Sequence, residues 1–253
     1  MKKNKIKPAL KYSSNVERKN YDNLLSMMFN SPMSRQDLFS NLGLFQTRAD
    51  LSKFLFLNDI YTKILNTPGV VMEFGVRWGQ NLAYFNSLRS IYEPFNTGRK
   101  IIGFDTFTGF PKISKKDGKS KSIKKGTLNV TKNYREYLNK LLSTHEKLSP
   151  RANVKKFEIV KGDVSKTLPK YLKRNPQTIV SLAFFDLTLY HPTKKTLKAI
   201  KPYLTKNSLI IFDQLNLEEF PGETLALKEI FGLNKYKLFK SPFSTYQTYL
   251  KLR

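Results

Sequence analysis

The chain has 253 residues, of which 40% are hydrophobic, and it contains no cysteine. That length and composition suit one large domain with its own core, or one domain with a small helical cap. The absence of thiols excludes disulfides, thiolate metal sites and cysteine nucleophiles. No apolar run reaches the roughly 18 residues of a membrane-spanning helix, and the basic first residues lack the apolar stretch of a signal peptide. We therefore expect a cytoplasmic protein.

A strong positive charge is the second feature of the composition. Lysine and arginine number 45 against 19 acidic residues, which gives a formal net charge of +26. Such a charge favours an anionic partner, whether a phosphorylated small molecule, a nucleic acid or a lipid surface. A lysine-rich proteome would give the same charge, because lysine is spread over most segments. The composition alone leaves these interpretations open.

The N-terminal quarter of the chain shows helical patterns and no strand patterns. Residues 1–20 are polar and basic, and helical patterns follow at 21–29, 36–42 and 49–65. Ser34 and Asp37 are placed to cap the second helix, because a short side-chain oxygen can bind the free amides of a helix start. We expect residues 1–66 to form a basic arm and helical cap, and residues 67–253 to form the main domain.

From residue 70 onward, strand and helix patterns alternate. Strand patterns cover 70–76, 100–105, 157–160, 178–186 and 208–213; helical patterns cover 80–92, 134–145, 165–173, 192–201 and 223–231. Two short β patterns, 236–239 and 245–250, close the chain as a hairpin. This order predicts the α/β class, with a seven-stranded, mostly parallel sheet that contains one antiparallel strand. Residues 112–126, rich in lysine, serine and glycine, are expected to form an exposed loop.

The turn after the first strand reads Glu73-Phe-Gly-Val-Arg-Trp-Gly79. Gly75 and Gly79 permit a tight turn and a close approach of the backbone to a ligand. A dinucleotide site would carry G-x-G-x-x-G here, to seat a pyrophosphate on the helix N-terminus. The carboxylate of Glu73 would repel pyrophosphate but suits the ammonium and sulfonium groups of S-adenosylmethionine (SAM). The alternative is an ordinary turn between strand and helix.

Acidic residues also end the next two strands. Asp105 could hold the two hydroxyls of a ribose, as acidic residues do in nucleotide sites. Asp163 follows Gly162 at the same edge of the predicted sheet, where it could meet an adenine. Each could instead be a turn residue or a helix cap.

Two further acids, Asp186 and Asp213, end the fourth and fifth strands. Carboxylates that converge from neighbouring strand ends could hold Mg²⁺, with Gln214 and Asn216 as neutral oxygen ligands. The metal would lower the pKa of a substrate hydroxyl, and Asp186 could accept the proton. His191 is an alternative base or substrate contact. The competing interpretation makes the two acids helix caps and His191 a structural residue.

In this order, the motifs resemble the macrocin O-methyltransferase-type family of class I SAM-dependent methyltransferases, whose members methylate sugar hydroxyls. The segments that carry the resemblance are 71–79, 103–111, 161–163, 185–193, 212–216 and 220–224. The resemblance implies a Rossmann-like fold with strand order 3-2-1-4-5-7-6. It also implies SAM as cofactor, self-association in many members, and a second metal-ligand position at Asp213.

The expected site residues follow from the motifs and the resemblance together. The expected SAM contacts are Glu73, Gly75, Val76, Gly79, Asp105, Thr106, Phe107, Asp163 and Asp186. The expected catalytic residues are Asp186 and His191, and the expected Mg²⁺ ligands are Asp186, Asp213 and Gln214.

Two positions depart from the family pattern. Thr188 stands where the family usually has the second acid of D-x-D-x-Y, and Gln214 stands where it usually has the second of two consecutive acids. The predicted metal site therefore loses charge. A metal-free mechanism with Asp186 or His191 as base would fit, as would an acceptor that is already anionic, such as a phosphate or phosphoramidate oxygen.

These observations predict a SAM-dependent O-methyltransferase that acts on a small polar acceptor. The acceptor would be a nucleotide-activated sugar or a phosphoryl group in surface polysaccharide (capsule) biosynthesis. The N-terminal helices, Trp78 and residues 112–126 are candidates for a lid, and the helical cap for a homo-oligomer interface. One alternative is a degenerate binding subunit. Another is a nucleic-acid methyltransferase, although the chain lacks an Asn/Asp-Pro-Pro-Tyr motif.

Overall fold

The computed structural model describes residues 14–243 and 246–252. The chain divides into two compact units, residues 1–51 and residues 52–253. Most of the predicted basic arm and residue 245 of the predicted closing hairpin lie outside the described residues. None of the described helices is long and apolar enough to cross a membrane.

The first unit is helical. It contains α1 (Asn15–Phe29), α2 (Arg35–Ser40), η2 (Leu42–Phe45) and the start of α3 (Arg48–Thr62). Helix α1 begins earlier than predicted because Ser14 and Glu17 form a capping box, in which each side chain accepts a hydrogen bond from the other residue's backbone amide. Ser34 caps α2 as predicted, with its Oγ 3.1 Å from the Asp37 amide nitrogen.

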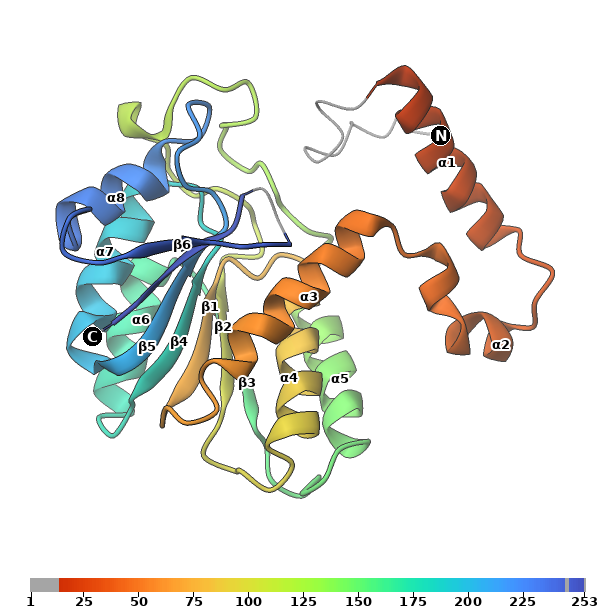
Figure 1. Ribbon diagram of the computed structural model, residues 1–253, viewed down its shortest axis with the longest axis horizontal. Coiled ribbons are helices and arrows are strands. Elements are labelled where there is room, and N and C mark those ends of the chain that lie inside the picture. Colours follow the sequence, from red (N-terminus) through yellow and green to blue (C-terminus); the bar gives the residue numbers. More distant parts are fainter. Residues whose placement is uncertain (1–13, 244–245, 253) are drawn as a thin grey trace. The chain divides into compact units, whose positions relative to one another are not determined.

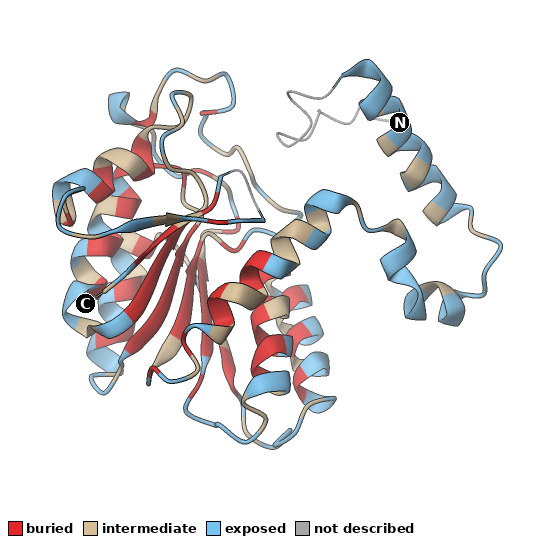
Figure 2. Cartoon of the chain, in the orientation of Figure 1, coloured by how far each residue is buried: buried red, intermediate tan, exposed pale blue. Residues whose placement is uncertain are grey.

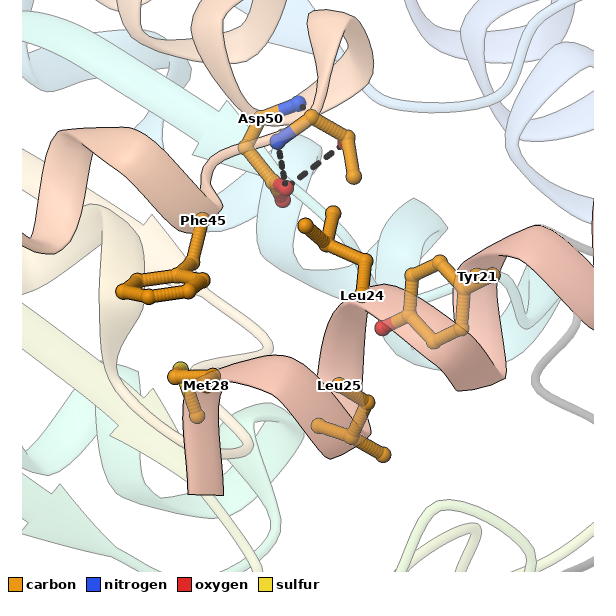
Figure 3. A pocket seen from close by; sticks show the side chains of 7 residues that line it. Tyr21, Leu24, Leu25, Met28, Phe45 and Asp50 are labelled. Atoms are coloured by element: carbon orange, nitrogen blue, oxygen red, sulfur yellow. Dashed lines mark hydrogen bonds between the residues drawn. The ribbon is translucent and has the colours of Figure 1, made fainter. Parts of the chain in front are cut away.

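A small cavity of about 50 Å³ lies within this unit (Figure 3). Its lining is mainly apolar and comes from Tyr21, Leu24, Leu25, Met28, Phe45, Thr47 and Asp50. The Asp50 carboxylate already accepts hydrogen bonds from the amide and hydroxyl of Thr47. The cavity is far below the roughly 300 Å³ of a typical ligand pocket, so we interpret it as a packing gap.

The second unit is built on a seven-stranded sheet of order β3-β2-β1-β4-β5-β7-β6, as predicted (Figure 1). The strands are β1 (Val70–Phe74), β2 (Ile101–Asp105), β3 (Phe157–Lys161), β4 (Val180–Phe185), β5 (Leu204–Phe212), β6 (Leu238–Lys240) and β7 (Thr248–Lys251). The first five are parallel, and β7 runs antiparallel to both β5 and β6.

Helices cover both faces of the sheet (Figures 1 and 2). One face packs against the second half of α3, α4 (Gln80–Tyr92) and α5 (Tyr134–Lys147); the other packs against α6 (Val164–Arg174), α7 (Tyr190–Ile200) and α8 (Gly222–Ile230). All six residues of β4 are buried, which explains its continuous apolar sequence. The predicted boundary at residue 66 stays a prediction, although α3 already contributes Phe56 and Ile60 to the core of the sheet.

The strand order reverses between β1 and β4, and open α/β sheets bind ligands at such a switch point, beyond the carboxyl ends of the strands. The strands end level there, because Phe74 pairs with both Phe104 and Phe185, and Phe185 pairs with Phe212. The first residues after these strands therefore meet at one edge of the sheet.

Residues 112–126 are not simply the exposed loop that the composition indicates. They contain the short helix η3 (Lys115–Asp117), and Asp117 and Ile123 are buried. The Asp117 carboxylate accepts a 2.6 Å hydrogen bond from the Tyr190 amide, and Lys116 contacts the Tyr190 hydroxyl and Glu229. The lysines face solvent, but the segment is anchored to α7 and α8.

Candidate active site

Backbone hydrogen bonds bring the predicted site residues to one edge of the sheet. Beyond the last paired residues, the Gly75 amide donates to the Phe104 carbonyl oxygen, the Asp186 amide to Phe74, and the Asp213 amide to Phe185, all at 2.8–2.9 Å. Gly75, Asp186 and Asp213 therefore lie next to one another at the switch point, as the alternation of strands and helices predicts.

Glu73 is a buried carboxylate with one free oxygen. It is 1% exposed, and its Oε1 accepts a 2.8 Å hydrogen bond from the side chain of Asn81 on α4. Among the described residues, its Oε2 has no hydrogen-bond partner. Burial raises the pKa of Glu73 well above its usual value, the charge of Asp186 adds to this, and Lys53 opposes it. A buried, unpartnered carboxylate oxygen fits the ammonium group of SAM.

The packing of the chain itself, rather than a ligand, requires glycine in the turn after β1. Gly75 has φ +97°, and a Cβ there would lie 2.0 Å from the carbonyl oxygen of Asp186. Only glycine lets the ends of β1 and β4 approach this closely. Gly79 has φ +79°, and a Cβ there would meet the Leu138 side chain at 2.5 Å. The contact of these residues with SAM stays a prediction.

Asp105 holds the turn after β1 in place. Its Oδ2 accepts hydrogen bonds from the amides of Val76 and Arg77, both at 2.8 Å, and its Oδ1 accepts one from the Phe107 amide at 2.6 Å. A carboxylate has about four acceptor sites, so one remains open for a ribose hydroxyl. The predicted ribose contact stays a prediction, with loop anchoring as an additional role that the sequence did not indicate.

The neighbours of Asp105 and the acid after β3 make local contacts. Thr106 Oγ1 donates to the Gly109 carbonyl oxygen at 2.8 Å, and Phe107 is 7% exposed and packs in the core. Asp163 is the N-cap of α6 and accepts hydrogen bonds from the amide and hydroxyl of Ser165. The capping role of Asp163 is therefore present, and its contact with adenine stays a prediction.

Asp186 has the electrostatic character of a base. Burial of its carboxyl, together with the nearby charge of Asp213, raises its pKa to about 8, against the opposing charges of Lys53 and Arg77. A carboxylate with such a pKa binds a proton much more strongly than an ordinary aspartate near neutral pH. The neighbouring carboxylate of Asp213 is restrained by Gln247, because its Oδ1 accepts a 2.6 Å hydrogen bond from that side chain.

The predicted metal ligands lie close together in the fold, but there are few of them. Across the described ranges, no group of three or more His, Cys, Asp or Glu side chains is arranged to hold a metal ion. Asp186 and Asp213 interact electrostatically, and the side-chain oxygen of Gln214 is buried and unpartnered within the part that the structure describes. These oxygen donors are of the type that Mg²⁺ accepts, and its binding stays a prediction.

His191 and Trp78 lie at the same edge. His191 is exposed in the first turn of α7, and its ring packs edge-on against Tyr190 at 5.1 Å. Trp78 is 42% exposed and packs at 4.7 Å against Tyr134, whose hydroxyl donates to the Trp78 carbonyl oxygen. A catalytic role for His191 and a lid role for Trp78 stay predictions.

Sequence reasoning missed several residues at this edge, among them Lys53, Asn81, Gln247 and Glu223. Lys53, on α3, lowers the pKa of both Glu73 and Asp186. Glu223 is fully buried at the start of α8, and burial together with the charge of Asp186 raises its pKa well above the usual value. The sequence did carry a signal for Glu223, because it stands in the segment 220–224 that contributes to the family resemblance.

Two solved structures resemble the chain over almost its whole length. The calicheamicin methyltransferase CalS11 is 41% identical, with 95% of this chain and 94% of that one covered and a TM-score of 0.92. The apo structure of CalS11, described as a TDP-rhamnose 3′-O-methyltransferase of calicheamicin biosynthesis, is 38% identical, with coverages of 95% and 96% and a TM-score of 0.84.

The chain belongs to the class I SAM-dependent O-methyltransferases. This methyltransferase also shares its fold with the O-methyltransferase NovP, at 17% identity, 79% coverage of each chain and a TM-score of 0.59. No protein-family model matches it, and no curated protein does. The narrower macrocin-type assignment is not confirmed. SAM is its methyl donor, and the free oxygen of Glu73 beside the turn after β1 is a group that fits the cofactor.

Proposed function

We propose that this methyltransferase transfers a methyl group to a hydroxyl of a nucleotide-activated sugar. The observation that carries the proposal is the 41% identity with CalS11 over nearly the full length of both chains, together with the description of CalS11 as a TDP-rhamnose 3′-O-methyltransferase. The net charge of +26 is consistent with an acceptor that carries a diphosphate.

The residues at the switch point divide the work of the reaction. SAM supplies an electrophilic methyl group on its sulfonium. Glu73 holds the ammonium end of the cofactor, and Asp105 keeps the turn after β1 in position through the backbone amides of Val76 and Arg77. Asp186 accepts the proton of the sugar hydroxyl as the oxygen attacks. Its raised pKa, about 8, makes it a strong enough base for this step near neutral pH.

Mg²⁺ is the second element of the proposal and is separable from the first. Asp186, Asp213 and the side-chain oxygen of Gln214 would hold the ion, which would stabilise the negative charge that develops on the acceptor oxygen. Without it, the ammonium of Lys53 is the positive charge that lowers the pKa of Asp186 most. Turnover in excess EDTA, compared with turnover after Mg²⁺ is restored, distinguishes the mechanism with Mg²⁺ from the mechanism without it.

The finer predictions come from the sequence and stay predictions. The departures at Thr188 and Gln214 suggest a phosphoryl or phosphoramidate acceptor, the composition suggests a cytoplasmic location, and the resemblance suggests capsule biosynthesis and homo-oligomers. No contact in the described residues favours nucleic acid as the substrate or a loss of catalysis.

The test is a methylation assay with the full chain, SAM and TDP-rhamnose, extended to a panel of UDP- and GDP-sugars. Mass spectrometry would detect a gain of one methyl group on the sugar. We expect a product from at least one nucleotide sugar and none from the free sugars. Tight binding of S-adenosylhomocysteine without methylation of any nucleotide sugar would contradict the proposed acceptor class, and methylation of an RNA or a phosphoryl oxygen instead would replace it.

A further inference from the structure

Three backbone amides close to Asp186 and Asp213 donate hydrogen bonds to one carboxylate. The sheet pairs the amides of Asp186 and Asp213 but not those of the residues that follow them. Glu223 Oε1 accepts hydrogen bonds from the amides of Leu187, at 2.9 Å, and Thr188, at 3.0 Å. Its Oε2 accepts one from the Gln214 amide at 3.3 Å. A single side chain from α8 therefore joins the loop after β4 to the loop after β5.

Glu223 is buried, and the residues around it are closely packed. The residue is 0% exposed, and a buried carboxylate is costly unless hydrogen bonds stabilise it. Its neighbour Gly222 is equally constrained, because a Cβ there would lie 2.5 Å from the Thr188 carbonyl oxygen and 2.6 Å from the Tyr190 amide nitrogen. Thr188 itself has a φ of +61°, a left-handed conformation that a threonine adopts only when its surroundings impose it.

We propose that Glu223 is a positioning residue for methyl transfer: its carboxylate ties the loops that follow β4 and β5 together and thereby fixes the spacing between Asp186 and Asp213. A helix-capping role does not explain the contacts, since both oxygens bind amides of other loops and none of α8's own. The inference rests on the proposed role of Asp186 as base, and it adds a residue that touches neither substrate nor cofactor.

The physical reason for such a tie is that the reaction depends on alignment. The acceptor oxygen, the methyl group and the base must be nearly in line, and a displacement of about 1 Å can cost on the order of 100-fold in rate. The amides of Asp186 and Asp213 are the last that the sheet pairs beyond β4 and β5, so the sheet no longer restrains the residues that follow them. Glu223 supplies the restraint at that point.

The test compares Glu223→Gln with a matched control, Glu146→Gln. Glutamine at 223 keeps one oxygen for Leu187 and Thr188 but turns an amide group toward the Gln214 amide, so the link to the β5 loop is lost. Glu146 is also a buried glutamate that accepts a backbone amide, from Lys156 at 3.0 Å, and it binds Arg89 as well. It lies in the last turn of α5, and its partner Lys156 stands just before β3, at the opposite edge of the sheet.

With TDP-rhamnose as acceptor, we expect Glu223→Gln to lower kcat by roughly 10- to 100-fold, while the affinity for S-adenosylhomocysteine stays within about twofold. Glu146→Gln should lower the Tm but leave kcat unchanged at a temperature where both variants are folded. An unchanged kcat in Glu223→Gln would overturn the proposal. So would parallel losses of kcat and cofactor affinity in both variants, because these would indicate a merely structural role. If Glu223→Gln does not fold, Gly222→Ala displaces the same contact.

Amide hydrogen exchange provides a readout that needs no acceptor. We expect exchange at Gln214 to accelerate at least about tenfold in Glu223→Gln, because the amide loses its hydrogen-bond acceptor, while exchange at Asp213 is unchanged. Equal exchange in the variant and the native enzyme would refute the tie itself. If native enzyme methylates no nucleotide sugar but exchange at Gln214 changes as expected, the proposed acceptor fails and the tie between the loops stands.

Discussion

Replacement of Asp105 by alanine should weaken cofactor binding through loss of the turn that Asp105 organises. Its carboxylate accepts three backbone amides, at 2.8, 2.8 and 2.6 Å, two of them from the turn after β1. A hydrogen bond to a charged group contributes about 1.5–3 kcal/mol when buried, and Asp105 is only partly buried, so the lower end applies. Part of each bond is replaced by water in the variant.

We therefore expect the affinity for S-adenosylhomocysteine to fall by about 1–3 kcal/mol, or roughly 5- to 150-fold. Isothermal titration calorimetry measures this directly. The same titration with a 2′,3′-dideoxy analogue separates the two roles of Asp105. If Asp105 also binds the ribose, native enzyme will prefer the natural ligand and Asp105→Ala will lose that preference. An unchanged affinity in Asp105→Ala would refute both roles.

Three further predictions follow from the buried charges. Because Asp186 must be deprotonated to act as base and its pKa is about 8, kcat should rise with pH and level off above that value; a flat profile between pH 6 and 9 would contradict its role. Lys53→Met removes a charge that lowers the pKa of Asp186, so the rising limb should move to higher pH. Glu73 has a raised pKa in the folded state, so the native state retains a proton that the unfolded chain releases, and stability falls as pH rises above about 4.5. Glu73→Gln should therefore raise the Tm at pH 8 while weakening S-adenosylhomocysteine binding; thermal unfolding and calorimetry test the two effects.

The sheet order could be predicted because its signals are local and repeated. Each strand from β1 to β5 is followed along the chain by a helix, and this alternation is typical of a parallel sheet. The same logic places Asp105, Asp186 and Asp213 at one edge, because the carboxyl ends of parallel strands lie together. The family resemblance supplied the order 3-2-1-4-5-7-6, which alternation alone does not determine.

The start of α1 shows a signal that was present but not used. Ser14 and Glu17 have the S-x-x-E spacing of a capping box, yet the helix was predicted to begin at residue 21 and begins at Asn15. In contrast, the anchoring of residues 112–126 depends on Asp117 meeting the Tyr190 amide, 73 residues away. No local pattern indicates such a contact, and the lysine-rich composition favoured an exposed loop.

The contacts of Glu223 and Asp105 were also beyond the sequence for a physical reason. Both carboxylates bind backbone amides, and an amide donor is the same at every position except proline. The sequence therefore shows which acids stand near strand ends but not which amides they accept. Gly75 is similar: its motif indicated closeness to a ligand, whereas the nearest atom to its missing Cβ is the Asp186 carbonyl oxygen.

The central claim is that a SAM-dependent enzyme uses Asp186 at the switch point as the base for O-methylation. The most direct test is the turnover of Asp186→Asn with a nucleotide sugar that the native enzyme methylates, beside its affinity for S-adenosylhomocysteine. We expect turnover to fall by at least about 100-fold while the cofactor affinity changes by less than about tenfold. Turnover close to that of the native enzyme would contradict the role of Asp186 and make His191 the next candidate for the base.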